Sequence, residues 1–301
     1  MSWQLGLARL EAELDRTLQR AAKIAGAGEQ LWQADRQTLA RILRIDDDAA
    51  GGLDAIRQQF NPAVELARLA GEGISFTGLG EDGYPPHLAE TFDPPFGLFT
   101  MGAALTTVCG DRPVIGVVGS RRPTAAGLTL ARTISQGLAA RGAVIVSGLA
   151  LGTDAAAHQA AIDVAAPTIA VTGASPEIVN PLGNAAIRRD ILDSGAVTSE
   201  YWPGTRPAAW QFPARNRIIA GLCHAVVVIE AGLRSGSLIT ADFALELGRP
   251  VLAVPHTPSP SAAGSNALLR AGALMCESAN DVIAELSDLT WNTEPEGTPI
   301  G

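Results

Sequence analysis

Three loops rich in glycine and serine are the segments of this sequence best suited to binding an anion. Each follows a short apolar run and precedes a helical pattern, and they span residues 116–124, 147–154 and 230–237. Small residues leave backbone N–H groups open at the start of a helix, where the helix dipole also favours negative charge. One such loop alone is more often a tight turn with a helix cap. Three of them together predict a shared phosphate-binding surface.

Each loop contributes specific candidates for that surface. They are Gly119, Ser120, Arg121 and Arg122 in the first loop, Gly148 and Gly152 in the second, and Ser235, Gly236 and Ser237 in the third. The arginines would add charge-assisted hydrogen bonds to those of the backbone amides. The first loop does not read G-x-G-x-x-G, and the strand before the second ends in Ser147-Gly148 rather than in an acid that could hold a ribose. Dinucleotide binding is therefore disfavoured.

A fourth segment, residues 201–217, interleaves aromatic rings with arginines in a chain that is only 5% aromatic. Rings stack on unpaired bases while arginines neutralise the nucleic-acid backbone, a combination suited to single strands. The aromatic residues either stack in this way or fill the core, and for the two tryptophans both interpretations stay open. These residues are Trp202, Trp210 and Phe212. The candidates for contacting DNA in this segment are Phe212, Arg215, Asn216 and Arg217.

Residues that could catalyse a reaction have simpler interpretations. Ser147, Asp154 and His158 could be drawn as a triad, but Asp154 and His158 lie four residues apart on one predicted helix and no G-x-S-x-G elbow is present. His224 precedes an apolar strand and His256 follows one, so packing or turn contacts are expected of both. We therefore expect no catalytic residue and no enzyme activity.

Neither the cysteines nor the acidic clusters indicate a metal site. The three cysteines, Cys109, Cys223 and Cys276, are widely separated and lack C-x-x-C spacing, which predicts neither a disulfide framework nor a zinc site. The acidic run at residues 46–48 suits the start of a helix, where aspartate caps free N–H groups, better than it suits a metal. No metal or cofactor is expected.

The positive charge of the chain is concentrated in one region. The 301 residues carry a formal net charge of -9, yet residues 112–270 hold 13 arginines against 9 acidic residues. Residues 1–111 hold 9 basic against 16 acidic residues, and residues 271–301 hold 6 acids and no base. A locally basic region inside an acidic chain indicates an anionic ligand, because a patch rather than the net charge selects the partner.

Short β-branched apolar runs alternate with helical patterns through this basic region. The predicted strands are Val114–Val118, Ala143–Val146, Thr168–Val171, Ala225–Ile229 and Val251–Val254, and the helical patterns between them are Ala125–Ala140, Asp154–Ala165, Asn184–Asp193 and Leu238–Leu247. Apolar strands imply a sheet covered on both faces, and the alternation implies an α/β fold with a doubly wound, mostly parallel sheet. In such sheets ligands bind beyond the carboxyl ends of the strands, where the three loops would meet.

The regions outside the sheet divide the chain further. Residues 1–72 predict a small helical domain, residues 73–110 a Pro- and Gly-rich connection that extends the core, and residues 111–287 the α/β domain. Residues 288–301 are expected to form a flexible tail. The first residues do not resemble a leader and no apolar run is long enough to cross a bilayer, so a cytoplasmic protein without membrane contact is expected.

From about residue 75 to 286 the chain resembles the DNA-processing protein A (DprA/Smf) family of bacteria. The resemblance rests on Gly119–Arg121, Ser147–Ala150, Gly152–His158, Ser199–Tyr201, Phe212–Leu222 and Ser235–Ala241. It implies an extended Rossmann-like domain behind a SAM-like helical domain, single-stranded DNA binding, a homodimer, and no catalysis. It also implies that the protein protects incoming single-stranded DNA and helps to load the RecA recombinase during natural transformation.

Carried onto this chain, the family's DNA contacts correspond to Arg121 and to the stretch Phe212–Arg217, with the loop Ser235–Ser237 nearby. Departures from the family pattern include Thr153 where Ile is usual and Cys223 where Ser is common, and none removes a basic residue. Many relatives also carry a C-terminal winged-helix domain. We expect none here, so the chain is either a short form or a truncated one.

Two alternatives to DNA binding stay open at this stage. Related Rossmann-like proteins hydrolyse nucleoside monophosphates with a Pro-Gly-Gly-x-Gly-Thr loop followed by a catalytic glutamate, and residues 230–238 lack both features. A nucleotide-binding protein without turnover is the second alternative. Binding that tightens with oligonucleotide length would favour a strand-binding groove over a nucleotide pocket.

Overall fold

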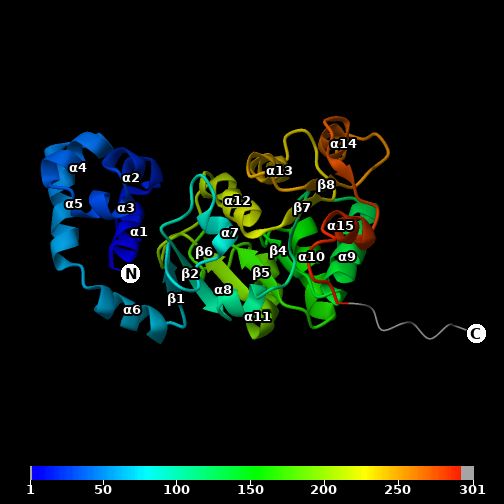
Figure 1. Ribbon diagram of the computed structural model, residues 1–301, viewed down its shortest axis with the longest axis horizontal. Coiled ribbons are helices and arrows are strands. Elements are labelled where there is room, and N and C mark those ends of the chain that lie inside the picture. The colour runs from blue at the N-terminus through cyan, green and yellow to red at the C-terminus, as the bar shows by residue number, and fades with distance from the viewer. Residues whose placement is uncertain (1, 293–301) are drawn as a thin grey trace, which may run out of the picture.

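The computed structural model describes residues 2–292, and they form a cluster of helices attached to a large α/β domain (Figure 1). The α/β domain contains a nine-stranded, mostly parallel sheet with helices on both faces. The predicted fold class, an extended Rossmann-like doubly wound sheet with a helical region before it, is confirmed.

The N-terminal region consists of short helices that pack around their own apolar core. These are α1 (Ser2–Leu14), α2 (Gln19–Ala25), α3 (Gly28–Gln33), α4 (Arg36–Leu43), α5 (Asp47–Gln59) and α6 (Pro62–Gly71). The core side chains include Leu7, Leu10, Leu31 and Leu39. Asp46 caps α5 by accepting a hydrogen bond from the Ala49 amide, as expected of the acidic run.

The helical region contacts the α/β domain through apolar and aromatic side chains. Leu5 and Ala8 of α1 are buried against Phe76 and Phe99 of the sheet. A basic side chain also contacts the far side of the junction: the Lys23 ammonium donates to the Phe92 carbonyl (2.6 Å) and lies 3.4 Å from the centre of the Phe92 ring.

The strands follow the order β1-β2-β6-β5-β4-β3-β7-β8-β9 across the sheet. Their bounds are β1 Ser75–Gly78, β2 Gly97–Gly102, β3 Val114–Val118, β4 Val144–Ser147, β5 Thr168–Val171, β6 Ala196–Ser199, β7 Ala225–Val228, β8 Val251–Ala253 and β9 Leu274–Met275. All neighbouring pairs are parallel except β1–β2 and β2–β6, which are antiparallel. Residues 75–102 therefore extend the parallel sheet by two strands.

The remaining helices cover the two faces of the sheet. They are α7 (Pro86–Ala89), α8 (Leu105–Cys109), α9 (Ala125–Ala140), α10 (Thr153–Asp163), the 3-10 turn η1 (Leu182–Asn184), α11 (Ala185–Ser194), α12 (Gln211–Leu222), α13 (Gly236–Glu246), α14 (Ala263–Arg270) and α15 (Ala279–Glu285). Along β3, Val114 and Val118 face the core under α12 and α13, whereas Ile115 and Val117 face the core under α9, α10 and α15. Both faces of the strand are buried, as its apolar sequence predicts.

The chain reverses direction across the sheet between β3 and β7. Strands β3 to β6 are added one after another on one side of β3, and β7 then pairs with the opposite side of β3. This reversal is a topological switch point, where doubly wound sheets leave a crevice beyond the carboxyl ends of the strands. Val118 and Val228 end the two strands there.

The end of the described chain differs from the expectation. Residues 288–292 were assigned to a flexible tail, but Leu289 and Trp291 pack against the core beside α9 and α15. The Trp291 indole N–H donates to the Leu286 carbonyl (3.0 Å), and the Asn292 amide donates to the Arg141 carbonyl (2.8 Å). An aromatic anchor thus holds this segment, while residues 293–301 of the expected tail lie outside the described residues.

Candidate nucleic-acid interface

A groove of about 940 Å³ opens at the switch point, between the loops that follow β3 and β7 and the start of α12. It is lined by nine of the residues predicted from the sequence, namely Gly119, Ser120, Arg121, Phe212, Arg215, Asn216, Ser235, Gly236 and Ser237. Leu233, Arg234, Pro260 and Ser261 line it as well. Segments up to 140 residues apart in the chain therefore meet around one hollow, as the sheet topology requires.

Arg121 and Phe212 form a pair on the wall of this groove. Arg121 is exposed, and its guanidinium lies 5.5 Å from the centre of the Phe212 ring, within range of a cation–π contact. Phe212, in the first turn of α12, is partly exposed and rests on Gly173, where an added Cβ would lie 2.9 Å from the ring. The pair offers a positive charge and an aromatic face side by side.

The start of α13 faces the groove and carries short polar side chains. Ser235 caps the helix by accepting from the Ser237 amide (3.4 Å), and the two hydroxyls lie 2.7 Å apart. Gly236 and Arg234 are exposed beside them. An 11-residue helix presents the positive end of its dipole here, so this start can hold an anion.

The first loop does not offer the open amides that its sequence predicts. Thr124, the residue before α9, donates its amide N–H (3.0 Å) and its hydroxyl (2.7 Å) to the Glu230 carboxylate. The Ser120 amide donates to the Glu230 carbonyl (2.7 Å), and the Arg122 amide donates to the Ser120 hydroxyl (3.0 Å). The expected amide cradle was wrong because an internal carboxylate, brought in by the neighbouring strand β7, already occupies it.

The two glycines of the second loop shape the backbone and do not line the groove. The Gly148 amide donates to the Asp154 carboxylate (3.1 Å), and a Cβ at Gly148 would lie 2.5 Å from the Arg215 guanidinium. Gly152 precedes α10 with φ +82°, and a Cβ there would lie 2.6 Å from the Ser120 carbonyl. Both positions need glycine for close packing between loops.

Arg215 is a buried structural residue at the floor of the groove. Its side chain is 4% exposed and donates to the carbonyls of Gly148 (2.9 Å) and Val171. Burial lowers the pKa of Arg215 to about 10, although the Asp154 carboxylate partly offsets this. Burial likewise raises the pKa of Asp154, against the opposing effect of Arg215. The two charges compensate each other inside the protein. Arg215 lines the groove, and its predicted contact with DNA stays a prediction.

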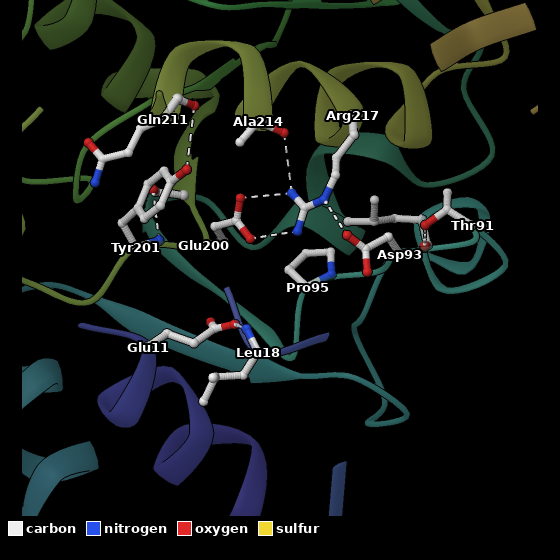
Figure 2. A network of polar contacts seen from close by, with 12 residues as sticks. Glu11, Leu18, Thr91, Asp93, Pro95, Glu200, Tyr201, Gln211, Ala214 and Arg217 are labelled. Atoms are coloured by element: carbon white, nitrogen blue, oxygen red, sulfur yellow. Dashed lines mark hydrogen bonds and ion pairs between the residues drawn. The ribbon is translucent and has the colours of Figure 1, made fainter. Parts of the chain in front are cut away.

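Arg217 points away from the groove, so it does not fit the predicted role of contacting DNA there. Its guanidinium forms two hydrogen bonds of 2.7 Å to the Glu200 carboxylate and lies 3.5 Å from Asp93 (Figure 2). Burial alone would lower the pKa of Arg217, but Glu200 outweighs burial and raises it. Within one turn of α12, Asn216 lines the groove whereas Arg217 faces Glu200 on another side of the helix.

Of the two remaining candidates, Asn216 stays at the groove and Arg122 does not. The Asn216 amide group donates to the Gly236 carbonyl (3.0 Å), which ties α12 to the start of α13. Its oxygen accepts from Arg215 (3.2 Å). Arg122 is exposed, and it is absent from the groove lining.

The two tryptophans of residues 201–217 differ in their surroundings. Trp202 packs edge-on against Phe99 (5.5 Å between ring centres) and lies under the Arg9 guanidinium (5.8 Å). It therefore fills the contact between the helical region and the sheet. Trp210 is 38% exposed, and the Tyr201 ring lies edge-on to it (5.9 Å between ring centres).

The histidines take structural roles in agreement with the sequence analysis. His158 lies 2.8 Å from the Thr168 hydroxyl and is not paired with Asp154, and burial lowers its pKa to about 3. His256 contacts the Ile229 carbonyl (2.7 Å). Within residues 2–292, no group of three or more His, Cys, Asp or Glu side chains could hold a metal ion. Nor does any helix of those residues combine the length and apolar character needed to span a bilayer.

Sequence reasoning placed Glu230 in the third loop but missed that its carboxylate lies at the start of α9, and it missed the loop around Ser261 as part of the groove. Glu230 follows β7 at its carboxyl end, the position at which doubly wound sheets present functional side chains, so its place in the chain was a usable signal. No sequence pattern predicts that Ser261 lies at the groove, because this residue belongs to the irregular segment between β8 and α14.

The arrangement matches a known family. The family model for DNA recombination-mediator protein A matches residues 75–287. The chain belongs to this family. A relative from Bacillus subtilis, DNA processing protein DprA, is 37% identical over 88% of this chain and 91% of its own length.

Two solved structures of family members share the fold. The X-ray structure of DNA processing protein A from Streptococcus pneumoniae superposes with a TM-score of 0.68 at 33% identity, over 95% of this chain and 93% of that one. A structure of DNA processing protein A from Helicobacter pylori, described for its single-stranded DNA binding mode, superposes with a TM-score of 0.64 at 30% identity. It covers 71% of this chain and 97% of that one.

Proposed function

We propose that the groove at the switch point binds single-stranded DNA and that the protein is a recombination mediator. The observation that carries the proposal is the convergence of Arg121, Phe212 and the start of α13 on one hollow. An arginine and a helix start can each bind a backbone phosphate, and a neighbouring ring can stack on a base. Bases that are already stacked in a duplex cannot use such a ring.

Membership of the family supports the choice of ligand. The Helicobacter pylori relative is described for its single-stranded DNA binding mode, and its structure covers 71% of this chain. The groove also lies in the basic part of the sequence, whereas the helical region is acidic. Counterion release from arginine contacts should make binding strongly dependent on salt.

We further propose that the protein protects incoming single-stranded DNA and helps to load RecA during natural transformation, in the cytoplasm. This rests on the family, whose model is described as a DNA recombination-mediator protein. The proposed loading is tested by ATP hydrolysis of RecA on single-stranded DNA. Hydrolysis should start sooner when the protein is added, and an unchanged lag would contradict the proposal.

A homodimer is part of the same proposal. Strand β9 forms one edge of the sheet, and its Leu274 and Met275 are 39% and 57% exposed. An apolar sheet edge of this kind can pair with another copy. Light scattering should give twice the mass of the chain, and a monomeric mass at high concentration would count against it.

We propose that the protein does not catalyse a reaction. The strongest enzymatic alternative, a phosphoribohydrolase, needs a glutamate that can reach a bound nucleotide. Glu230 is fully buried and hydrogen-bonded to Thr124, so it is engaged in the fold. No free base and no ribose 5-phosphate should be released when nucleoside monophosphates are incubated with the protein, and release of a free base would favour the enzyme.

The decisive experiment is a set of binding isotherms for oligonucleotides of graded length, single- and double-stranded, at two salt concentrations. Affinity should increase with length over several nucleotides, prefer single strands, and fall as salt rises. A mononucleotide that binds as tightly as the longer strands would instead favour a nucleotide-binding protein.

A further inference from the structure

The start of α9 lies at the switch point, where doubly wound sheets commonly hold the phosphate of a nucleotide. In this chain the place is filled from inside the protein. The Glu230 carboxylate accepts hydrogen bonds from both the amide and the hydroxyl of Thr124, at 3.0 and 2.7 Å. Its Oε2 atom thus has the position and partners that a phosphate oxygen would take at a helix start.

The surroundings of Glu230 are built to keep the carboxylate there. The residue is fully buried, and a Cβ at Gly127 would lie 2.2 Å from its Oε2, so a side chain at this position would displace the carboxylate. The second oxygen, Oε1, has no hydrogen-bond partner among the described residues. Burial alone would raise the pKa of Glu230, but the hydrogen bonds from Thr124 oppose burial. Together with the nearby Ser261 hydroxyl and His256 they outweigh it, and the pKa is lowered. The group is therefore an anion at neutral pH.

The loop before α10 is filled in the same manner. The Asp154 carboxylate accepts from the amides of Gly148 (3.1 Å) and Ala150 (3.3 Å). Arg215 balances the charge of Asp154, whereas within residues 2–292 no arginine or lysine forms an ion pair with Glu230. Among the described residues, no carboxylate accepts a hydrogen bond at the start of α13, the third predicted helix start.

We propose that Glu230 is a specificity-determining residue whose carboxylate takes the place of a nucleotide phosphate at the start of α9 and so excludes free nucleotides from the groove. The inference rests on the proposed function, because it explains why the groove would select a strand. A terminal phosphate carries close to two negative charges, so the buried Glu230 carboxylate would repel it from the start of α9. An internal phosphodiester carries one charge and can lie at Arg121 and the start of α13 instead.

The test compares Glu230→Ala, which empties the site, with Glu230→Gln, which keeps its shape and removes its charge. The probes are AMP and inorganic phosphate, measured by calorimetry. We expect no measurable AMP binding by the parent protein at millimolar concentration, and affinity at least about tenfold higher in both variants. Phosphate or formate should also raise the Tm of Glu230→Ala but not of the parent protein, because binding to the native state stabilises it.

Glu246→Gln is the matched control, since it removes one charge from an exposed position on α13. It should leave AMP binding undetectable. If the Ala variant does not fold, as checked by circular dichroism, the Gln variant decides the question alone. AMP binding that is equal in the parent and Gln proteins would overturn the inference.

The two proposals fail in different ways. If the parent protein binds single strands but neither variant gains affinity for AMP or phosphate, the inference about Glu230 is wrong and the proposed function stands. If the parent protein binds no oligonucleotide of any length, the proposed function is wrong whatever the variants do.

Discussion

At the scale of single residues, three arginines that the sequence predicts to contact DNA have different surroundings. Arg121 is exposed on the groove, Arg215 lies buried under it, and Arg217 is bound to Glu200 on another side of α12. The sequence could predict that arginines gather near residues 212–217. It could not predict which are buried, because the partners Gly148 and Glu200 come from distant segments.

Replacing Arg121 with Ala should weaken single-stranded DNA binding for all sequences alike. One lost phosphate contact reduces the slope of log K against log salt by about 0.7 for a single strand. Fluorescence anisotropy at four salt concentrations would measure both effects. Arg122→Ala is the matched control, because Arg122 is equally exposed but outside the groove. Equal losses in the two variants would show that only general charge matters.

Truncating Phe212 to Ala should reduce DNA affinity by about 1–3 kcal/mol, because a stacked base loses its aromatic partner. The Tm should change little, since Phe212 is partly exposed. Trp202→Ala should do the reverse, because that ring fills an internal contact with Phe99. Thermal denaturation together with binding isotherms separates the two effects, and a Phe212 variant that loses stability but not affinity would refute the stacking role.

At the scale of elements, apolar runs were sufficient to place the central strands. Strands β3 and β5 have the predicted bounds, β7 and β8 end one residue earlier than predicted, and β4 is shifted by one residue at both ends. Strand β6 was missed because Ala196–Ser199 has two small polar residues in a buried position. Strands β1 and β2 were missed because they lie in a Pro- and Gly-rich segment, whose composition predicts a connection. Their antiparallel pairing depends on contacts with the rest of the sheet.

The backbone of the β4–α10 loop should tolerate no side chain at Gly152. An alanine there would adopt a positive φ near the Ser120 carbonyl, at a cost of about 1–3 kcal/mol, and would displace the neighbouring Arg121 loop. Chemical denaturation should show the lost stability, and DNA affinity should fall with it. Gly71→Ala, in a helix where an added Cβ meets nothing within 4 Å, provides the comparison. No difference between these variants would contradict the packing role of Gly152.

At the scale of the whole molecule, three carboxylates surround Arg217 where the helical region meets the sheet. Glu200 binds the guanidinium directly, Asp93 lies 3.5 Å away, and Glu11 of α1 accepts from the Leu18 amide (2.6 Å) nearby (Figure 2). Burial, and then the charge of Glu200, raise the pKa of Glu11 to about 8. The sequence gives no sign of this cluster, because it depends on how two regions dock.

The stability of the protein should therefore decrease as the pH rises towards 9. The native pKa of Glu11 lies above its ordinary value of 4.5. The contribution of the neutral Glu11 carboxyl to the free energy of unfolding is therefore complete below about pH 4.5 and is lost as the pH passes 8. Glu11→Gln stays neutral and should raise Tm by a few degrees at pH 9 while changing little at pH 5. Melting curves at both pH values test this, with the exposed Glu13→Gln as control; a Gln variant with the parent's pH profile would refute it.

The contact between Lys23 and Phe92 provides a way to measure how firmly the helical region is attached to the α/β domain. Lys23 is the one lysine among the 22 basic residues of the chain, and its amine is held by a carbonyl and an aromatic ring that belong to the other side of the junction. An acylating dye would react with this amine faster once the two regions separate. The labelling rate of one side chain therefore reports, in solution and without any substitution, how often the junction opens.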